Sequence, residues 1–137
     1  MNKKAFTIIE LLVVIAIIGL LAAIVLTTVK TVKEKSRDAR RVSDIKSIQE
    51  GLTIYENDAQ IFPVYDGYIT GSDIVSLALL SNGAMKAMPL DPLNAVVDGV
   101  IYKYYYQSVN GATYLIKYYL ETNSIQGRSK GLNTASP

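Results

Sequence analysis

The chain has 137 residues, with 14 Lys and Arg against 12 Asp and Glu and a formal net charge of +2 at pH 7. This length fits one domain. The sequence contains no Cys, His or Trp, which excludes disulfide scaffolds, thiol chemistry, zinc fingers and every catalytic scheme that uses imidazole. The small net charge argues against a dedicated nucleic-acid binder, and the hydrophobic content of 50% argues against a disordered chain.

The apolar residues are concentrated near the N-terminus, in the segment Phe6–Val29 (FTIIELLVVIAIIGLLAAIVLTTV). As a helix this segment would span about 36 Å, which exceeds a hydrocarbon core of about 30 Å. Its aliphatic residues favour insertion by about 5 to 10 kcal/mol, whereas the carboxylate of Glu10 costs at most about 2.5 to 3.5 kcal/mol. The segment therefore predicts a transmembrane helix.

Three simpler interpretations compete for the same segment. A cleaved signal peptide would have an apolar core of about 7 to 15 residues and an A-x-A-like site, whereas Leu21-Ala22-Ala23 is followed by more apolar residues. A buried core helix of this length would be difficult to cover in a domain this small. An ordinary single-span anchor with no further role remains open.

Beyond Val29 the sequence predicts that the helix continues as an amphipathic helix, because Gly and Pro are absent between Gly19 and Gly51. Together the two parts predict one helix from about Phe6 to Glu56, roughly 75 Å long. The predicted apolar stripe consists of Val29, Val32, Ser36, Ala39, Val42, Ile45, Ile48, Leu52 and Tyr55. Basic residues between Lys30 and Lys46 alternate with acidic ones on the other face. This pattern favours a solvated face or ion pairs between subunits over contacts with phosphate or lipid headgroups.

The remaining residues predict a small mixed head. Asn57-Asp58 and Phe62-Pro63 are expected to break the long helix, and a short helix is expected from a cap near Ser72 to Gly83. The segment Met88–Asn94 contains two prolines and predicts a stiff extended loop.

Two strands and a hairpin are expected after this loop. The strands are predicted over Val100–Gln107 and Thr113–Leu120, and Asn110-Gly111 between them is a strong hairpin signal. The residues from Arg128 to Pro137 form a polar tail that can remain disordered. The expected fold class is α+β, with the long helix packed on a small antiparallel sheet.

Ten tyrosines are present, and most lie between Tyr102 and Tyr119. We expect them to cover a sheet face through period-two alternation. A stacking platform for single-stranded nucleic acid would also use aromatic residues, but only Lys103 and Lys117 accompany the tyrosines.

The segment Lys3–Val14 (KKAFTIIELLVV) closely resembles the start of type IV prepilins and type II secretion pseudopilins. Asp38–Asp44 (DARRVSD) and Met88–Pro92 (MPLDP), followed by the Tyr-rich hairpin, resemble small pseudopilin heads more loosely. The resemblance implies that a membrane prepilin peptidase cleaves between Ala5 and Phe6 and that the new Phe6 amine is N-methylated. The family usually has Gly before the cleaved bond, where this chain has Ala5.

The sequence departs from the family pattern in further ways. The membrane half lacks the helix-breaking Pro that is common in type IV pilins, and the absence of Cys removes the C-terminal disulfide loop of many pilins. Calcium binding is known in major secretion pseudopilins. Here Asp91, Asn94, Asp98 and Glu121 do not form a recognisable ligand series, so we expect neither a metal nor another cofactor.

Glu10 is the one carboxylate within the apolar segment. It could reach water from one turn inside the membrane edge. Alternatively it could pair with positive charge at its own helix N-terminus or at the Phe6 ammonium of a neighbouring subunit. An unpaired carboxylate in an apolar bundle costs several kcal/mol, so pairing between subunits would select the axial offset of neighbouring helices. The resemblance favours an assembly role for Glu10 together with Phe6.

These observations give five expected regions. Residues 1–5 are the leader, 6–29 the transmembrane and filament-core helix, 30–56 the amphipathic helix, 57–127 the head and 128–137 the polar tail. The positive-inside rule alone places the head in the cytoplasm, whereas the resemblance places the N-terminus there and the head outside the membrane.

The resemblance implies a structural subunit of a type IV pilus-like filament, used in attachment, motility, secretion or DNA uptake. It implies a homo-oligomeric helical filament, a prepilin peptidase, an inner-membrane platform and an ATPase motor as partners, with lipid around the helix before assembly. The alternative is a membrane-anchored binding module that does not polymerise and whose Tyr-rich head binds DNA or an exported protein. An enzyme is a poor third choice, because His, Cys and a close carboxylate pair are missing.

Overall fold

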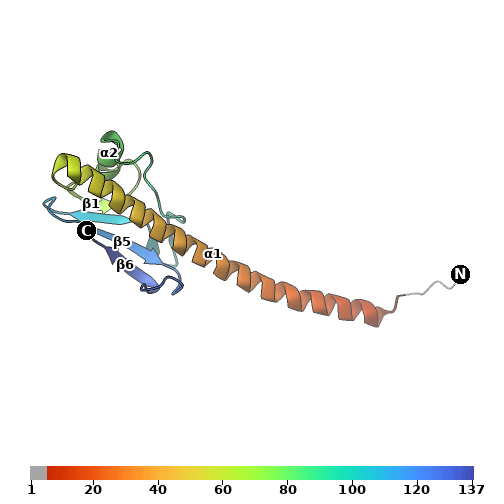
Figure 1. Cartoon of the computed structure of the whole chain (residues 1–137). Coiled ribbons are helices and arrows are strands. Elements are labelled where there is room, and N and C mark those ends of the chain that lie inside the picture. The colour runs from red at the N-terminus through yellow and green to blue at the C-terminus, as the bar shows by residue number, and fades with distance from the viewer. Residues whose placement is uncertain (1–5) are drawn as a thin grey trace. The chain divides into compact units, whose positions relative to one another are not determined.

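The computed structural model describes residues 6–137, apart from the side chains of Leu26 and Thr27. The chain divides into two compact units, Met1–Glu34 and Lys35–Pro137, which are described separately. Helix α1 (Ile8–Ala59) contributes to both units. An apolar N-terminal helix and a small antiparallel sheet are present, which confirms the α+β class (Figure 1).

The long helix begins and ends near the predicted positions, but Asn57 and Asp58 do not break it. Both residues are helical, and α1 ends only at Ala59. Gln60 then adopts a φ of 58°, its backbone N–H closes the last turn on the carbonyl of Glu56, and Pro63 follows. Asn and Asp have low helix propensity, but packing of the helix against the head outweighs a weak local preference.

In the first unit the helix is apolar on all sides from Leu11 to Val25. The described side chains from Phe6 to Val25 are exposed, including every large aliphatic residue. The helix is long and apolar enough to cross a membrane by length and composition. A helix that is apolar all round needs an apolar environment on every side.

The second unit is built on a four-stranded antiparallel sheet in the order β1-β4-β5-β6. Its strands are β1 (Tyr65–Tyr68), β4 (Tyr105–Ser108), β5 (Leu115–Leu120) and β6 (Gly131–Ala135). A separate hairpin joins β2 (Ala95–Val97) to β3 (Val100–Tyr102), and helix α2 (Ile74–Ser81) precedes it. From Lys35 onward α1 lies along one face of the sheet (Figure 1).

One of the two expected strands is wrong in its extent. The run Val100–Gln107 does not form one strand, because it divides at Lys103-Tyr104 between β3 and β4 in different sheets. The chain folds back at Asp98-Gly99, where both residues have positive φ angles of 50° and 78°. Asp-Gly is a preferred sequence for a two-residue hairpin turn. Because of this turn, Val100–Tyr102 pairs with β2 and does not continue into β4.

The polar segment 128–137 is not a disordered tail in the structure. Gly131–Ala135 forms β6 and pairs with β5 along its length, from Ile116 with Ala135 to Leu120 with Gly131. Only alternate residues of an edge strand need to face the core, so its sequence can be polar and still be paired. The hairpin between β4 and β5 is confirmed, with Asn110-Gly111 in its loop.

The core lies between α1, α2 and the sheet. Part of the predicted stripe on α1 is confirmed, because Ile45, Ile48 and Leu52 are fully buried. Toward the N-terminus of this unit, however, the buried stripe continues through Arg41 and Asp38 rather than through Ala39 and Ser36. The other buried core members are Ile69, Val75, Leu79, Tyr104, Tyr106, Tyr114, Ile116, Tyr118 and Leu120.

Replacing a buried residue of this stripe should destabilise the head much more than replacing an exposed neighbour. Leu52 is 0% exposed and Ile54 is 49% exposed. We expect Leu52→Ala to lower the free energy of unfolding by about 2 to 5 kcal/mol through lost burial and a cavity. Ile54→Ala should change it by less than about 0.5 kcal/mol. Chemical unfolding of the full chain in detergent, followed by tyrosine near-UV circular dichroism, measures both, and equal effects would contradict this core.

Candidate functional site

The N-terminal end of α1 holds the predicted processing and assembly residues. Ala5 lies outside the described residues. Phe6 precedes the helix and is exposed, and Glu10 lies in the first turn. The backbone N–H and the hydroxyl of Thr7 both donate to Oε2 of Glu10, at 2.8 and 2.9 Å, and the N–H of Glu10 donates to the Thr7 hydroxyl at 3.2 Å.

This reciprocal arrangement is a capping box, in which the residue before the helix and the residue three positions later satisfy each other's backbone donors. Thr7 thus holds the Glu10 carboxylate at the N-terminal end of its own helix. The pairing of Glu10 with a Phe6 ammonium stays a prediction. The sequence signal was present as T-x-x-E before an apolar run, but the role of Thr7 was missed.

A second cluster of polar residues is buried inside the head and centres on Arg41. Its guanidinium donates from Nε and Nη2 to the two carboxylate oxygens of Asp91, at 2.7 and 3.1 Å. Nη1 donates to Asp38 at 2.8 Å and to Glu121 at 2.6 Å. The side chains of Arg41 and Asp38 are 0% exposed, so these interactions form away from water, where charges interact most strongly.

Asp38 and Glu121 connect this cluster to the loop after β5. Asp38 accepts hydrogen bonds from the backbone N–H groups of Glu121 and Thr122, at 2.9 and 2.8 Å, and from the Thr122 hydroxyl. Arg37 binds the carboxylate of Glu121 from the other side through two nitrogens. The ring of Tyr102 faces the Arg41 guanidinium, 4.9 Å away.

The cluster shifts the pKa of its members in ways that follow from these contacts. Burial alone would raise the pKa of Glu121, but hydrogen bonds from Arg37 and Arg41 outweigh it and hold this pKa below its usual value. For nearby Asp44 the balance is reversed: burial raises its pKa despite the hydrogen bond that it accepts from Tyr104.

The sequence-based expectation of a solvated charged face is therefore wrong for part of α1. Arg40 and Lys46 are exposed, but Asp38 and Arg41 are fully buried within one subunit. Their spacing of three, continued by Ile45 and Ile48, places them on the buried side of the helix. That spacing could have indicated that Asp38 and Arg41 are buried. The apolar residues Ala39 and Val42, however, favoured a different buried side of the helix.

The residues of the head do not fit a calcium ion. Both carboxylate oxygens of Asp91 are bound by Arg41, Glu121 is bound by two arginines, and Asp98 occupies the exposed β2–β3 turn. Within residues 6–137 no group of three or more acidic side chains is arranged to hold a metal ion.

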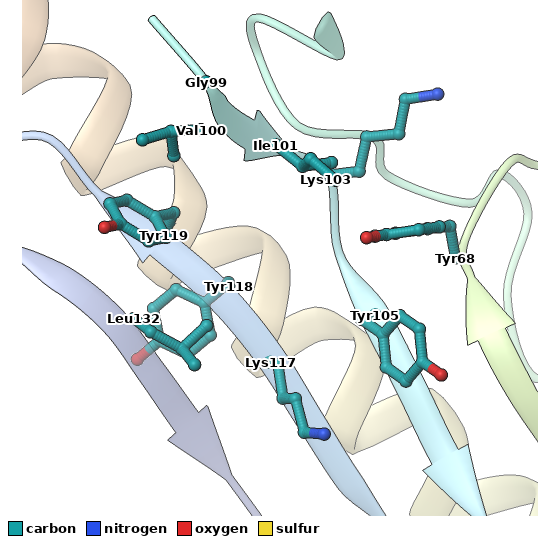
Figure 2. A pocket seen from close by; sticks show the side chains of 10 residues that line it. All are labelled: Tyr68, Gly99, Val100, Ile101, Lys103, Tyr105, Lys117, Tyr118, Tyr119 and Leu132. Carbon is teal, nitrogen blue, oxygen red and sulfur yellow. The ribbon is translucent and has the colours of Figure 1, made fainter. Parts of the chain in front are cut away.

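The tyrosines divide between the two faces of the sheet. Tyr104, Tyr106 and Tyr118 are buried in the core. On the opposite face a pocket of about 390 Å³ lies between the β2–β3 hairpin and the main sheet (Figure 2). Tyr68 and Tyr105 meet edge to face there, with ring centroids 5.0 Å apart.

Two lysines border this pocket, Lys103 and Lys117, and the ammonium group of Lys117 lies 5.2 Å from the ring centre of Tyr105 (Figure 2). Asp66 on β1 accepts hydrogen bonds from Tyr105 and Gln107 on the same face. Nonspecific binding of single strands needs stacking aromatics together with a basic groove that follows the phosphates. Two lysines beside a carboxylate do not supply such a groove.

Comparison with known proteins identifies the N-terminal segment. Residues 1–26 match the family model described as a prokaryotic N-terminal methylation motif. The chain is similar to the type II secretion system core protein G of Escherichia coli (strain K12), with 32% identity over 97 residues, which covers 66% of this chain and 67% of that protein.

Shorter matches join the chain to proteins of the same name in other bacteria. The Pectobacterium carotovorum protein is 38% identical over 62 residues, covering 45% of this chain and 40% of the relative. The Vibrio cholerae protein is 34% identical over 65 residues, covering 47% and 44%. No solved structure matches the chain significantly.

The ion cluster predicts a pH-dependent contribution of Glu121 to stability. A carboxyl whose pKa is lower in the folded state stabilises the fold above its unfolded-state pKa, about 4.3 for Glu, and this contribution disappears as the pH falls through the folded-state pKa. The melting temperature of Glu121→Gln should therefore lie furthest below that of the unmodified protein near pH 7, and the difference should shrink as the pH falls below about 4.

The raised pKa of Asp44 acts in the opposite direction, but it is common to both proteins and cancels in their difference. Glu50→Gln is the matched control, because Glu50 is exposed and its ion-pair distance to Lys46 is 4.0 Å, so its effect should be small at every pH. A Glu121→Gln difference that stays constant from pH 7 to pH 3 would contradict this role.

Proposed function

The chain belongs to the family of the type II secretion system core protein G, a pilin-like filament subunit, and we propose that it polymerises into the pseudopilus of a secretion system of this type. The observation that carries the proposal is the helical segment Ile8–Val25, which is apolar on every side apart from one carboxylate near its start, that of Glu10. Lipid satisfies such a surface in the monomer. In a filament the helices of other copies replace the lipid.

The assembly role of Glu10 follows from its hydrogen bonds. Oε2 of Glu10 accepts from both donors of Thr7, so Oε1 is the oxygen that an incoming ammonium can approach. Cleavage between Ala5 and Phe6 would create that ammonium at Phe6. We infer that the Phe6 amine of a neighbouring subunit pairs with Glu10 and thereby fixes the axial offset of adjacent helices, because a mismatched offset leaves two charges unpaired in an apolar bundle.

The proposal also sets the partners and the location. A prepilin peptidase removes residues 1–5 and the Phe6 amine is methylated, which fits the match of residues 1–26 to the methylation motif. The N-terminus faces the cytoplasm and the head faces the periplasm, and a platform protein and an ATPase motor on other chains drive extraction from the membrane.

The alternative of a binding module that does not polymerise has less support. It would use the Tyr-rich head, but much of this tyrosine surface is core: Tyr104, Tyr106 and Tyr118 are buried. Proteins similar to this chain are structural subunits rather than enzymes, and we propose no catalytic activity for it.

Processing is the first prediction of this proposal. Cleavage after Ala5 removes Lys3 and Lys4, so the mature chain should begin at Phe6 and carry one methyl group on its amine. Intact mass spectrometry and N-terminal sequencing of the protein from its native membrane measure this directly. A mature protein that retains Met1, or that begins after Ala23, would rule out the proposed processing site.

The second prediction separates the two roles of Glu10. Glu10→Leu removes the charge and favours membrane insertion, so it should accumulate in the membrane but enter filaments poorly. Glu10→Gln retains a side chain that can complete a capping box but has no charge, and it should show the same filament defect. Glu10→Asp, which keeps the charge with a shorter reach, should be intermediate.

Membrane level and filament yield are scored separately, by immunoblotting of membranes and by electron microscopy of sheared filaments. Ile17→Leu is a matched control within the same exposed apolar surface and should behave as the unmodified protein. A normal filament yield from Glu10→Leu would show that the carboxylate is only a tolerated snorkelling residue.

A further inference from the structure

The loop between β5 and β6 is fastened to α1 through charged groups. Its first residues, Glu121 and Thr122, donate their backbone N–H groups to Asp38, and the Glu121 carboxylate is bound by Arg37 and Arg41. The loop after α2 is attached to the same place, because Asp91 receives two hydrogen bonds from Arg41 and one from the backbone of Leu93. One guanidinium thus joins three segments of the chain.

The charges of this cluster require a cation at its centre. Three carboxylates, those of Asp38, Asp91 and Glu121, contact the Arg41 guanidinium, and Arg37 provides a second positive charge at the edge. With both arginines the cluster has a net charge of about −1. Without Arg41 the buried cluster would have a net charge of about −2, and buried unpaired charges cost several kcal/mol each.

The same geometry leaves few free oxygen ligands for a divalent ion. The carboxylate oxygens facing the centre are within hydrogen-bond distance of guanidinium nitrogens. The Thr122 hydroxyl already binds Asp38 and Ser124, and the side-chain oxygen of Asn123 accepts from the backbone N–H of Lys130. The loop also carries two cations of its own, Arg128 and Lys130. Calcium takes six to eight oxygen ligands, and these groups are already engaged by protein donors.

We propose that the Arg41 guanidinium is the built-in cation of this head, balancing the three buried carboxylates that would otherwise need a metal ion between them, so that the fold is independent of divalent metal. The proposal concerns the head alone and does not depend on filament assembly. It also predicts that, once Arg41 is removed, the three carboxylates can rearrange around a divalent ion that replaces the lost positive charge.

The experiment compares melting temperatures of the full chain in detergent, at matched ionic strength, in EDTA and in CaCl2. The unmodified protein should melt at the same temperature in both. Arg41→Ala should melt at a lower temperature in EDTA and recover by roughly 5 °C or more in CaCl2, a shift that this measurement resolves easily in a domain of this length. Arg41→Lys keeps a cation at the centre and should not respond to calcium.

Two further variants test whether a response arises in this cluster. Arg40→Ala removes the neighbouring exposed arginine, whose Nε lies 3.9 Å from Asp44, and should not create a calcium response. Asp91→Asn combined with Arg41→Ala removes one carboxylate and should abolish the response of Arg41→Ala. Where Arg41→Ala does not fold in EDTA, recovery of its tyrosine near-UV circular dichroism signal on addition of CaCl2 replaces the melting temperature in both comparisons.

Two results would overturn the proposal. The first is a melting temperature of the unmodified protein that falls in EDTA and recovers in CaCl2, since the head would then depend on a metal despite Arg41. The second is an Arg41→Ala protein that has the same melting temperature in EDTA and CaCl2, or that stays unfolded in both, since calcium would then not replace the guanidinium between the three carboxylates.

Discussion

The buried guanidinium of Arg41 lies where α1, the loop after α2 and the loop after β5 meet. Burying charges costs more than burying apolar groups, so such a cluster adds less to stability than its short distances suggest. Its value lies in geometry, because a planar group with fixed donor directions accepts only one arrangement of its carboxylates. Apolar packing of Ile45, Ile48 and Leu52 against the sheet tolerates small shifts, whereas this cluster fixes the position of α1 along it.

The first unit follows the opposite principle. From Phe6 to Val25 its described side chains are exposed and, apart from Thr7 and Glu10, carry no polar group. Those two residues bind each other, and the Thr28 hydroxyl binds the carbonyl of Ile24. No feature of this surface selects one direction of approach. The carboxylate of Glu10 is the exception, and a single charge in an apolar helix is a strong constraint because its cost does not depend on the shape of the neighbours.

The elements with strong periodic signals could be predicted from the sequence, and those that depend on tertiary pairing could not. The long helix, α2 and the β4–β5 hairpin follow from apolar spacing, caps and the Asn110-Gly111 turn. Strand β6 is polar and short, and only its pairing with β5 makes it a strand. The division of Val100–Gln107 depended on a turn at Asp98-Gly99, whose signal a continuous β-like run concealed.

The same distinction applies to the candidate sites. Phe6 and Glu10 could be proposed because the N-terminal motif is local and specific. The Arg41 cluster could not be foreseen, since Asp91 and Glu121 are separated from Arg41 by 50 and 80 residues and only the fold brings them together. Within α1 itself, charged residues at Asp38 and Arg41 were assigned to the solvated side, because a buried ion pair has the same sequence appearance as an exposed one.

The hydrogen bonds from the β5–β6 loop to Asp38 join residues 83 and 84 positions apart in the chain. Such contacts form only after a long loop has closed, which lowers the entropy of the chain, and folds rich in them form slowly. Synthesis at about 5 to 20 residues per second separates the completion of α1 from the emergence of its partners by several seconds. A helix that enters the membrane early therefore exposes the side that later packs on the sheet, including Ile45, Ile48 and Leu52, until the sheet has formed. During this interval a chaperone or a protease has the most access to the protein.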